Sequence, residues 1–256
     1  MFKISKNSLA FDRGHSDELS YQTCKILLGS PEKFQGMEII YAKESIFTQH
    51  CIFTLGGAHY KNITLNCVRI EQNKVYEADN KDILKFSGLE RGFRLYLMAS
   101  PFEQSRVGCV RDSFEHSFSS AEDKIRVIKG PEFDYLKDPN EFLEHPFMIS
   151  ANSDLSGLRL EGKKISAKQY DITSSIVDDG VIQLTSNGPI VLLRERQITG
   201  GYPRVFCVVK TDLDFLVQYG IGTMVHFELI EIAEAKALLL QRERELKLLI
   251  EKLESA

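Results

Sequence analysis

The segment at residues 188–205 carries the side chains best suited to hold a small polar ligand. Its polar and glycine positions are Arg196, Gln197, Thr199, Gly200 and Gly201. The planar and hydroxyl groups can hydrogen-bond a carboxylate or an amide, and consecutive glycines permit positive φ and leave backbone amides bare. On spacing alone, an ordinary glycine-bearing β turn with solvated charges remains the favoured interpretation.

General catalytic and metal-binding signatures do not occur in the sequence. There is no Gly-x-Ser-x-Gly, Cys-x-x-Cys, His-Glu-x-x-His or Gly-x-Gly-x-x-Gly, and the histidines are not at metal-ligand spacing. We therefore expect no metal site. The run from Gly157 to Lys163 has the spacing of a phosphate-binding loop, but Lys164 replaces the required Ser or Thr. Its context also predicts a strand leading into a loop, whereas the phosphate motif must open a helix.

Short runs of alternating residues dominate the chain and predict β-strands. In the first half the runs are at 39–41, 51–55, 63–70, 83–86 and 93–99; in the second they are at 125–128, 158–160, 181–184, 190–193, 205–209 and 225–229. In the run at 93–99, the apolar side chains at odd positions predict one buried face of the strand. Arg94, Tyr96 and Met98 alternate with them and predict a face of mixed polarity. The fold class is therefore mainly β.

Helices are few, and the longest is expected at the C-terminus. We predict a first helix capped by Ser16 and ended by Gly29, and short helices near residues 140–144 and after Thr211. An apolar stripe with flanking charges predicts a long amphipathic helix at 236–256. The favoured interpretation packs this helix on its own barrel; the alternative is a docking helix for another subunit.

The chain of 256 residues is long for one domain, and a polar stretch at 100–123 predicts the division. We expect domains at residues 1–110 and 111–235, followed by the helix. A formal net charge of −4 without a basic cluster argues against nucleic-acid binding. Five scattered cysteines, no apolar leader and no long apolar run predict a cytoplasmic protein that neither enters nor spans a membrane.

The run from Arg196 to Pro203, Arg-Gln-Ile-Thr-Gly-Gly-Tyr-Pro, resembles a long signature of the family that comprises allophanate hydrolase subunit 2 and the C subunit of 5-oxoprolinase. Upstream, the run from Ser153 to Gly162 is similar to that family's Ser-Asp-Arg-Met-Gly-x-Arg-Leu-Glu-Gly. The segments 125–131, 27–32 and 37–39 are similar in the same order, so the resemblance covers nearly the whole chain.

The chain also departs from this family pattern. The family's longer glycine-rich start is reduced to Asp12-Arg13-Gly14, and Leu155 and Ser156 stand where the family has Arg and Met. The Pro-Gly expected before Ile182-Gln183 is missing. We therefore expect no hydrolysis of 5-oxoproline or ATP by the isolated chain.

The resemblance implies two cyclophilin-like β-barrels and a sister subunit of the type found in allophanate hydrolase subunit 1 and the B subunit of 5-oxoprolinase. It implies an ATP-dependent 5-oxoprolinase that opens a lactam to glutamate, with ATP acting at the level of the complex and no covalently bound cofactor. The alternatives are a carboxyltransferase subunit of a biotin-dependent urea carboxylase and a regulatory module that antagonises a kinase inhibitor.

The resemblance also implies roles for individual residues. A small carboxylate or amide substrate would be bound by Arg159, Arg196, Gln197, Thr199, Gly200, Gly201 and Tyr202. Proton transfer is expected from Glu38, Asp154 and Glu161, although the sequence assigns none of them as acid or base.

Overall fold

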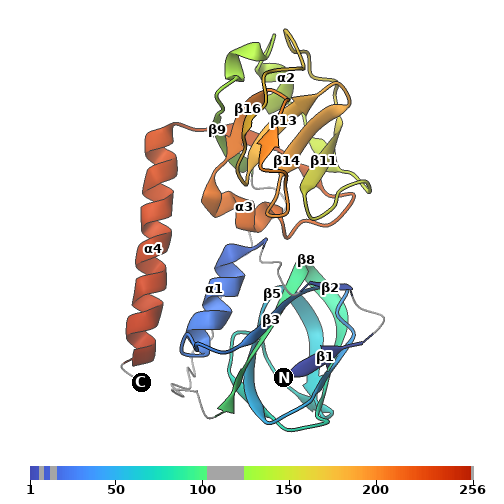
Figure 1. Cartoon of the computed structure of the whole chain (residues 1–256), viewed down its shortest axis with the longest axis vertical. Helices are drawn as coiled ribbons and strands as arrows, with labels where there is room; N and C mark the ends of the chain where they lie inside the picture. Colours follow the sequence, from blue (N-terminus) through green and yellow to red (C-terminus); the bar gives the residue numbers. More distant parts are fainter. Residues whose placement is uncertain (6–8, 12–15, 103–123, 255–256) are drawn as a thin grey trace. The chain divides into compact units, whose positions relative to one another are not determined.

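The computed structural model describes residues 1–5, 9–11, 16–102 and 124–254, and the chain divides into two compact units. The first unit is Met1–Phe118 together with Glu243–Ala256, and the second is Ser119–Arg242 (Figure 1). The predicted boundary between residues 110 and 111 lies outside the described residues, as does the Asp12-Arg13-Gly14 segment.

An eight-stranded antiparallel sheet forms the first unit. Its strands are β1 (Phe2–Ile4), β2 (Leu9–Phe11), β3 (Gln35–Ile40), β4 (Glu44–Phe47), β5 (Cys51–Leu65), β6 (Val68–Arg69), β7 (Tyr76–Ala78) and β8 (Ile83–Pro101). The long strand β8 pairs with β5 on one side and with β3 and β4 on the other. The sheet therefore curves around one core, which includes the fully buried Phe47, Phe53 and Leu95.

The sequence predicted separate short strands at 51–55 and 63–70, and at 83–86 and 93–99. The structure instead has the long strands β5 and β8, whose pairing continues from Cys51 opposite Pro101 to Leu65 opposite Leu84. The prediction failed because exposed polar residues interrupt the hydrophobic pattern without interrupting the backbone ladder. The register shifts beside Gly57, which has a positive φ, so the pairing passes through a bulge rather than ending.

Helix α1 (Glu18–Leu27) covers one face of this sheet. Its N-cap is Asp17 rather than the predicted Ser16, because the Asp17 carboxylate accepts a hydrogen bond from the Ser20 backbone N–H at 2.9 Å. The helix approaches β5 closely, since a Cβ on Gly56 would lie 2.7 Å from the Cys24 sulfur.

The packing of α1 also explains why the predicted mixed face of β8 is buried. Tyr96 and Met98 belong to a cluster with Cys24 and Leu28 of the helix, and each of the two is 1% exposed. The alternation along β8 was predicted correctly, but its second face is covered by a helix that lies far from β8 in sequence.

The second unit contains another eight-stranded sheet, in the order β17-β10-β11-β14-β13-β16-β9-β18. Its strands are β9 (Ile125–Lys129), β10 (Phe147–Ile149), β11 (Gly157–Gly162), β13 (Val181–Thr185), β14 (Gly188–Leu192), β16 (Arg204–Val208), β17 (Met224–Val225) and β18 (Phe227–Leu229). The two edge strands, β17 and β18, are separated only by His226. The sheet therefore returns to its beginning and nearly closes as a barrel.

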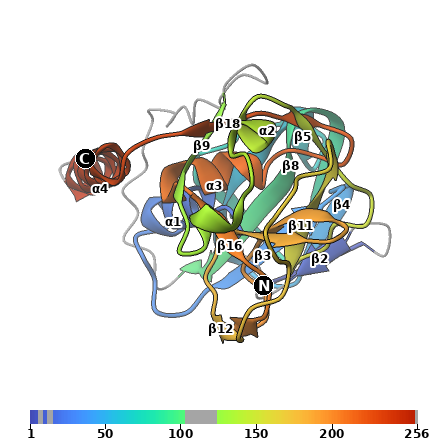
Figure 2. The ribbon, with the colours of Figure 1, turned by 90° about the horizontal axis from the view of Figure 1, so that it is seen from above.

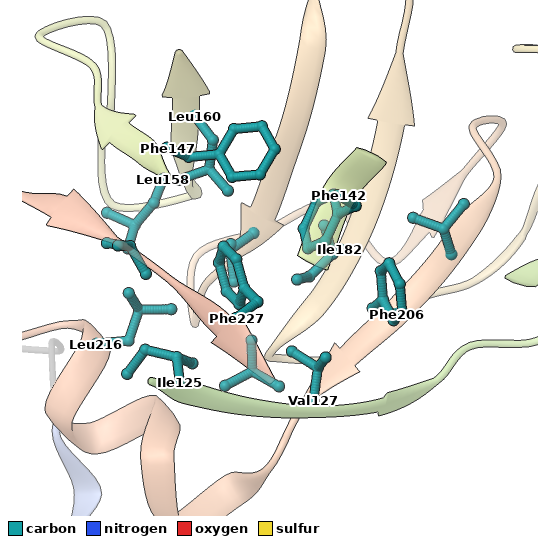
Figure 3. Close-up of a cluster of buried hydrophobic side chains, with 14 of the residues drawn as sticks. Ile125, Val127, Phe142, Phe147, Leu158, Leu160, Ile182, Phe206, Leu216 and Phe227 are labelled. Carbon is teal, nitrogen blue, oxygen red and sulfur yellow. The ribbon is translucent and has the colours of Figure 1, made fainter. Parts of the chain in front are cut away.

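Aromatic side chains fill the interior of this barrel (Figure 3). Helix α2 (Asn140–Leu143) contributes Phe142, whose ring centre lies 4.7 Å from that of Phe206 and 5.0 Å from that of Phe227. Burying one such side chain stabilises the fold by about 1.5–3 kcal/mol. This cluster gives the outer face of the strands a rigid support.

A separate two-stranded sheet, β12 (Ser175–Ile176) with β15 (Thr199–Gly200), lies outside the barrel strands (Figure 2). Next to it, Val177 packs with Val181 and Leu192 in a small cluster apart from the barrel interior. The β12–β15 sheet therefore belongs to a segment that covers part of the outer face of the barrel.

The remaining helices are the 3-10 turn η2 (Phe133–Tyr135), α3 (Lys210–Leu216) and α4 (Ile232–Glu254). Thr211 lies inside α3, whose N-cap is Val209, so the predicted cap was two residues too late. Arg242 of α4 is ion-paired with Asp214 of α3. The predictions of a mainly β chain with barrels and a long C-terminal helix are confirmed, although α4 begins earlier than residue 236.

Candidate functional site

A row of paired residues crosses three strands on the outer face of the second barrel. Arg159 on β11 is paired with Ile190 on β14, which is paired with Gln183 on β13. Paired residues in antiparallel strands project to the same side, and the alternate residues Leu158 and Ile182 belong to the core. Two strand spacings place the Arg159 and Gln183 Cα atoms about 10 Å apart.

The predicted signature turn lies directly over Gln183. The Gln197 Nε2 group donates to Gln183 Oε1 at 3.2 Å, and Gln183 Nε2 donates weakly to the Tyr202 carbonyl at 3.5 Å. Although it is on the outer face of the barrel, Gln183 is only 1% exposed. The turn thus covers the Gln183 side chain and adds a second side-chain amide, Gln197, that bonds to it.

Gly200 is required here by close approach rather than by its φ angle. A Cβ at this position would lie 2.3 Å from the Gln183 Nε2 atom. Neither Gly200 nor Gly201 is among the glycines with positive φ, so neither uses the left-handed conformation that the sequence suggested for them. The bare Cα of Gly200 lets the chain pass directly over the glutamine.

Arg196 is held by groups of its own chain. Its guanidinium donates to the Val177 carbonyl at 3.2 Å and to the Asp178 carboxylate at 2.8 Å, and it is also ion-paired with Asp179. A ligand carboxylate at Arg196 would have to displace these partners. The arrangement fixes the start of the signature turn to the segment that follows β12.

Arg204 anchors the other end of the signature turn. Its guanidinium forms two hydrogen bonds with Glu132, at 2.7 and 2.8 Å, and a third with the Ile176 carbonyl at 2.9 Å. The hydrogen bonds from Arg204 hold the pKa of Glu132 below its usual value. Arg204 therefore connects β12, β16 and the turn after β9.

Asp154 lies in the turn before β11, close to the Arg159 end of the row. Its carboxylate accepts from the Ser156 backbone N–H at 2.8 Å, from the Ser156 hydroxyl at 2.6 Å and from Gly157 N–H at 3.2 Å. Partial burial acts to raise the pKa of Asp154, but these bonds, with attraction from Arg159, leave it below its usual value. This carboxyl is therefore ionised at neutral pH, and its lowered pKa makes it a weak base.

Glu161 lies two residues beyond Arg159 on the same exposed face of β11. The Ser150 hydroxyl donates a hydrogen bond to its carboxylate. Arg159 and Glu161 thus share the exposed face of β11, and Asp154 lies in the turn that precedes the strand.

Glu38 lies in the first unit and is fully buried on β3. Its oxygens accept from the Arg94 guanidinium at 2.8 Å, from the Tyr96 hydroxyl at 2.7 Å and from the backbone and hydroxyl of Ser16 at 2.9 and 3.4 Å. A proton-transfer role would require these bonds to break. Burial, with a smaller effect from the nearby Glu38 carboxylate, raises the pKa of Tyr96 well above its usual value.

The other predicted binding residues lie around the turn. Thr199 is paired with Ile176 in the small sheet, Gly201 follows β15, and the Tyr202 side chain is 41% exposed. All predicted site residues except Glu38 thus lie in the second unit.

Sequence reasoning gave no role to Gln183 or Ser175. Gln183 is the one amide in the otherwise apolar start of its strand, Val-Ile-Gln-Leu. An amide in such a buried run needs a hydrogen-bond partner, so this pattern could have identified Gln183 as a candidate site residue. Ser175 carries no comparable sequence signal, because its position opposite Gly200 arises only from strand pairing.

The phosphate-loop spacing at residues 157–163 has no matching structure. Gly157–Gly162 is strand β11, and the Lys163 amine lies 3.8 Å from the Glu141 carboxylate.

Among the described residues, no cluster of His, Cys, Asp or Glu side chains could hold a metal ion. Within the same part of the chain, no helix is long and apolar enough to cross a membrane.

Comparison with known proteins identifies related sequences. The family model of the carboxyltransferase domain, subdomain A and B, matches residues 12–107 and 99–229. The C subunit of the 5-oxoprolinase of Haemophilus influenzae is 25% identical over 262 aligned residues, which cover 88% of this chain and 84% of that protein. The Escherichia coli protein of the same name is 34% identical over 116 residues, which cover 44% of this chain but only 37% of that relative.

Solved structures share the fold. The urea amidolyase of K. lactis matches with a TM-score of 0.79 and 17% identity over 97% of this chain. The urea carboxylase of Kluyveromyces lactis gives a TM-score of 0.78 and 17% identity over the same share. The matched regions are 20% and 29% of those longer chains, respectively.

Proposed function

Because this chain belongs to the family of the carboxyltransferase domain, subdomain A and B, we propose that it is the substrate-binding subunit of an ATP-dependent hydrolase of the 5-oxoprolinase type. Two relatives are named as the C subunit of 5-oxoprolinase, which supports both this reaction and a complex with a sister subunit. In this proposal the complex opens a lactam to glutamate.

The observation that carries the proposal is the row from Arg159 to Gln183 beneath the signature turn. It places a cation and two side-chain amides on one face of a rigid sheet. A cyclic amide with a carboxylate offers the complementary groups, because guanidinium binds carboxylate bidentately and an amide pairs with an amide. Arg159 would bind the carboxylate, and Gln197 would orient the lactam.

Arg159 is a better candidate than Arg196 for the carboxylate. The Arg159 side chain is exposed, and the acidic neighbour acting on it is Asp154, whereas Arg196 already contacts Asp178 and Asp179. We assign Arg196 to fixing the turn. Asp154, as an ionised carboxylate beside Arg159, would act as a weak base, and Glu161 with its Ser150 partner would orient polar groups of the substrate.

ATP is assigned to the complex rather than to this chain alone. The only run with phosphate-loop spacing that the sequence offered is a strand, and its lysine faces Glu141. We place the complex in the cytoplasm, which the free thiols of the described cysteines support.

The test begins with the tagged full chain purified alone and together with its co-purifying subunits. Glutamate formed from 5-oxoproline is then measured with and without ATP. We expect no turnover by the chain alone and ATP-dependent turnover by the complex. Loss of a charge-assisted bond costs about 1.5–3 kcal/mol, so Arg159→Ala should raise KM roughly 10- to 100-fold.

Arg194→Ala is the matched control. Its side chain is 43% exposed and lies 3.6 Å from Asp179, so the variant removes one positive charge near the signature turn without touching the row. If Arg159→Ala and Arg194→Ala raise KM equally, Arg159 contributes only its positive charge and forms no specific bond to the substrate. If the complex contains a biotin-bearing partner and carboxylates urea, the carboxyltransferase alternative replaces the proposal. If the chain co-purifies with a kinase system and no turnover is detected, the regulatory alternative replaces it.

A further inference from the structure

The Ser175 hydroxyl is an unexplained buried polar group beside the signature turn. Its oxygen is shielded from solvent and has no hydrogen-bond partner among the described residues. Buried hydroxyls normally find a partner, because leaving one unsatisfied destabilises the fold. The described part of the chain therefore leaves the burial of this hydroxyl unexplained.

Strand pairing shows the direction in which Ser175 projects. Ser175 is directly opposite Gly200, and directly paired residues of antiparallel strands project to the same side. A side chain on Gly200 would point into the Gln183 amide, which lies 2.3 Å from the Cβ position. The Ser175 hydroxyl is therefore on the same side of the small sheet as Gln183.

The two glutamines retain hydrogen-bonding capacity. A side-chain amide offers two donor hydrogens and an oxygen with two lone pairs. Gln183 uses its oxygen once, with Gln197, and uses its nitrogen in a long bond of 3.5 Å to the Tyr202 carbonyl. The Gln197 side chain is exposed, and its described hydrogen bond uses only its nitrogen.

We propose that Ser175, Gln183 and Gln197 together form a subsite for the N–C=O group of the substrate. The Ser175 hydroxyl donates to the substrate carbonyl, and a glutamine oxygen accepts from the substrate N–H. This inference rests on the proposed function, which it extends by naming the groups that recognise the amide. Lactams and ureas share this chemistry, so the subsite can be tested with either.

Substrate access requires the β12–β15 sheet to move away from Gln183. The bonds that join the turn to Gln183 are neutral, at 3.2 and 3.5 Å, and such bonds are weaker than charge-assisted ones. Arg196 holds Asp178 just after the small sheet, and Arg204 donates to the Ile176 carbonyl of β12 itself. Opening would break the neutral contacts to Gln183 and the single Arg204 bond to Ile176, and would leave the Arg196–Asp178 and Arg204–Glu132 pairs in place.

Ser175→Ala separates a binding role from a folding role. Removing an unsatisfied hydroxyl should leave the melting temperature unchanged or raise it. If the hydroxyl binds substrate, the same variant should weaken binding roughly three- to tenfold, as expected for one neutral hydrogen bond. Thr54→Val is the matched control, because Thr54 in the first unit also has a buried hydroxyl without a hydrogen-bond partner among the described residues.

The measurement is calorimetric titration of the full chain, alone and in its purified complex, with 5-oxoproline, 2-pyrrolidone and urea. The lactam 2-pyrrolidone lacks the carboxylate, so it should be insensitive to Arg159→Ala but sensitive to Ser175→Ala. Gln183→Met, which removes the amide at similar volume, should weaken the same probe. Thr54→Val should weaken none.

The outcomes separate the subsite from the proposed function. If Arg159→Ala weakens 5-oxoproline binding while Ser175→Ala and Gln183→Met do not, the function stands and the subsite is rejected. If the protein binds urea but neither lactam, the function is rejected, and the variants test the subsite with urea. Binding of none of the probes by the wild-type complex, or a fall in the melting temperature of Ser175→Ala, overturns the inference.

Discussion

Glu38→Gln should destabilise the first unit strongly, because it removes the carboxylate charge opposite a buried guanidinium. Glu38 and Arg94 side chains are 0% and 3% exposed, and they are joined at 2.8 Å. Removing one partner of a buried ion pair typically costs about 3–5 kcal/mol. Glutamine keeps the volume but presents an amide nitrogen to groups that are themselves donors, including the Tyr96 hydroxyl.

This loss would be a large part of the total stability, which is about 5–15 kcal/mol for a typical protein. The corresponding fall in melting temperature is on the order of 10 °C for a unit of this size. We would measure it by calorimetry and by urea denaturation of the full chain. Glu44→Gln is the control, because its ion pair with Lys85 spans 3.8 Å between side chains that are 36% and 57% exposed. An exposed pair of this kind contributes about 0–1 kcal/mol.

A loss of less than about 1 kcal/mol in Glu38→Gln would refute this reasoning, since a buried pair would then behave like an exposed one. A variant that folds normally but loses turnover in the complex would instead support the proton-transfer role predicted for Glu38 from the sequence. The two measurements therefore distinguish a structural carboxylate from a catalytic one.

Two further predictions concern the signature turn. Gly200→Ala should destabilise the second unit by about 1–3 kcal/mol, as overpacking usually does, because its Cβ would meet Gln183; Gly201→Ala, whose Cβ would lie 3.4 Å from its nearest neighbour, should cost less in the same urea denaturation. Equal losses would show that the close approach is unimportant. The hydrogen bonds from Arg204 lower the pKa of Glu132 below 4.5, so the stability gained from this pair is present above that pH and lost as the pH falls below it. The stability difference between wild type and Glu132→Gln should therefore shrink from about pH 6 to about pH 3, and a constant difference would contradict the linkage.

Strand content and family could be predicted because both depend on local patterns. Alternation along 93–99 identified part of β8, and the run at 196–203 identified the signature without any knowledge of its neighbours. Strand length was harder, since the ladder between β5 and β8 continues through exposed residues that the hydrophobic pattern treats as breaks. Backbone pairing depends on a partner strand rather than on the side chains of the strand itself.

Polar roles were decided by tertiary structure. Arg196 and Arg159 are the same residue type in two motifs of the family resemblance, yet one is enclosed by Asp178 and Asp179 while the other is exposed. Glycine at position 200 was expected from the signature, but its reason, the amide of Gln183 beneath it, is visible only in the folded chain.

The sequence by itself determined that this chain is mainly β, that it carries the family signature and which polar residues accompany that signature. The tertiary structure decided which of those residues meet. Strand pairing brings Ser175 opposite Gly200 and aligns Arg159 with Gln183 across β14. These contacts join segments that are far apart in sequence, and no local pattern of residues encodes the register that creates them.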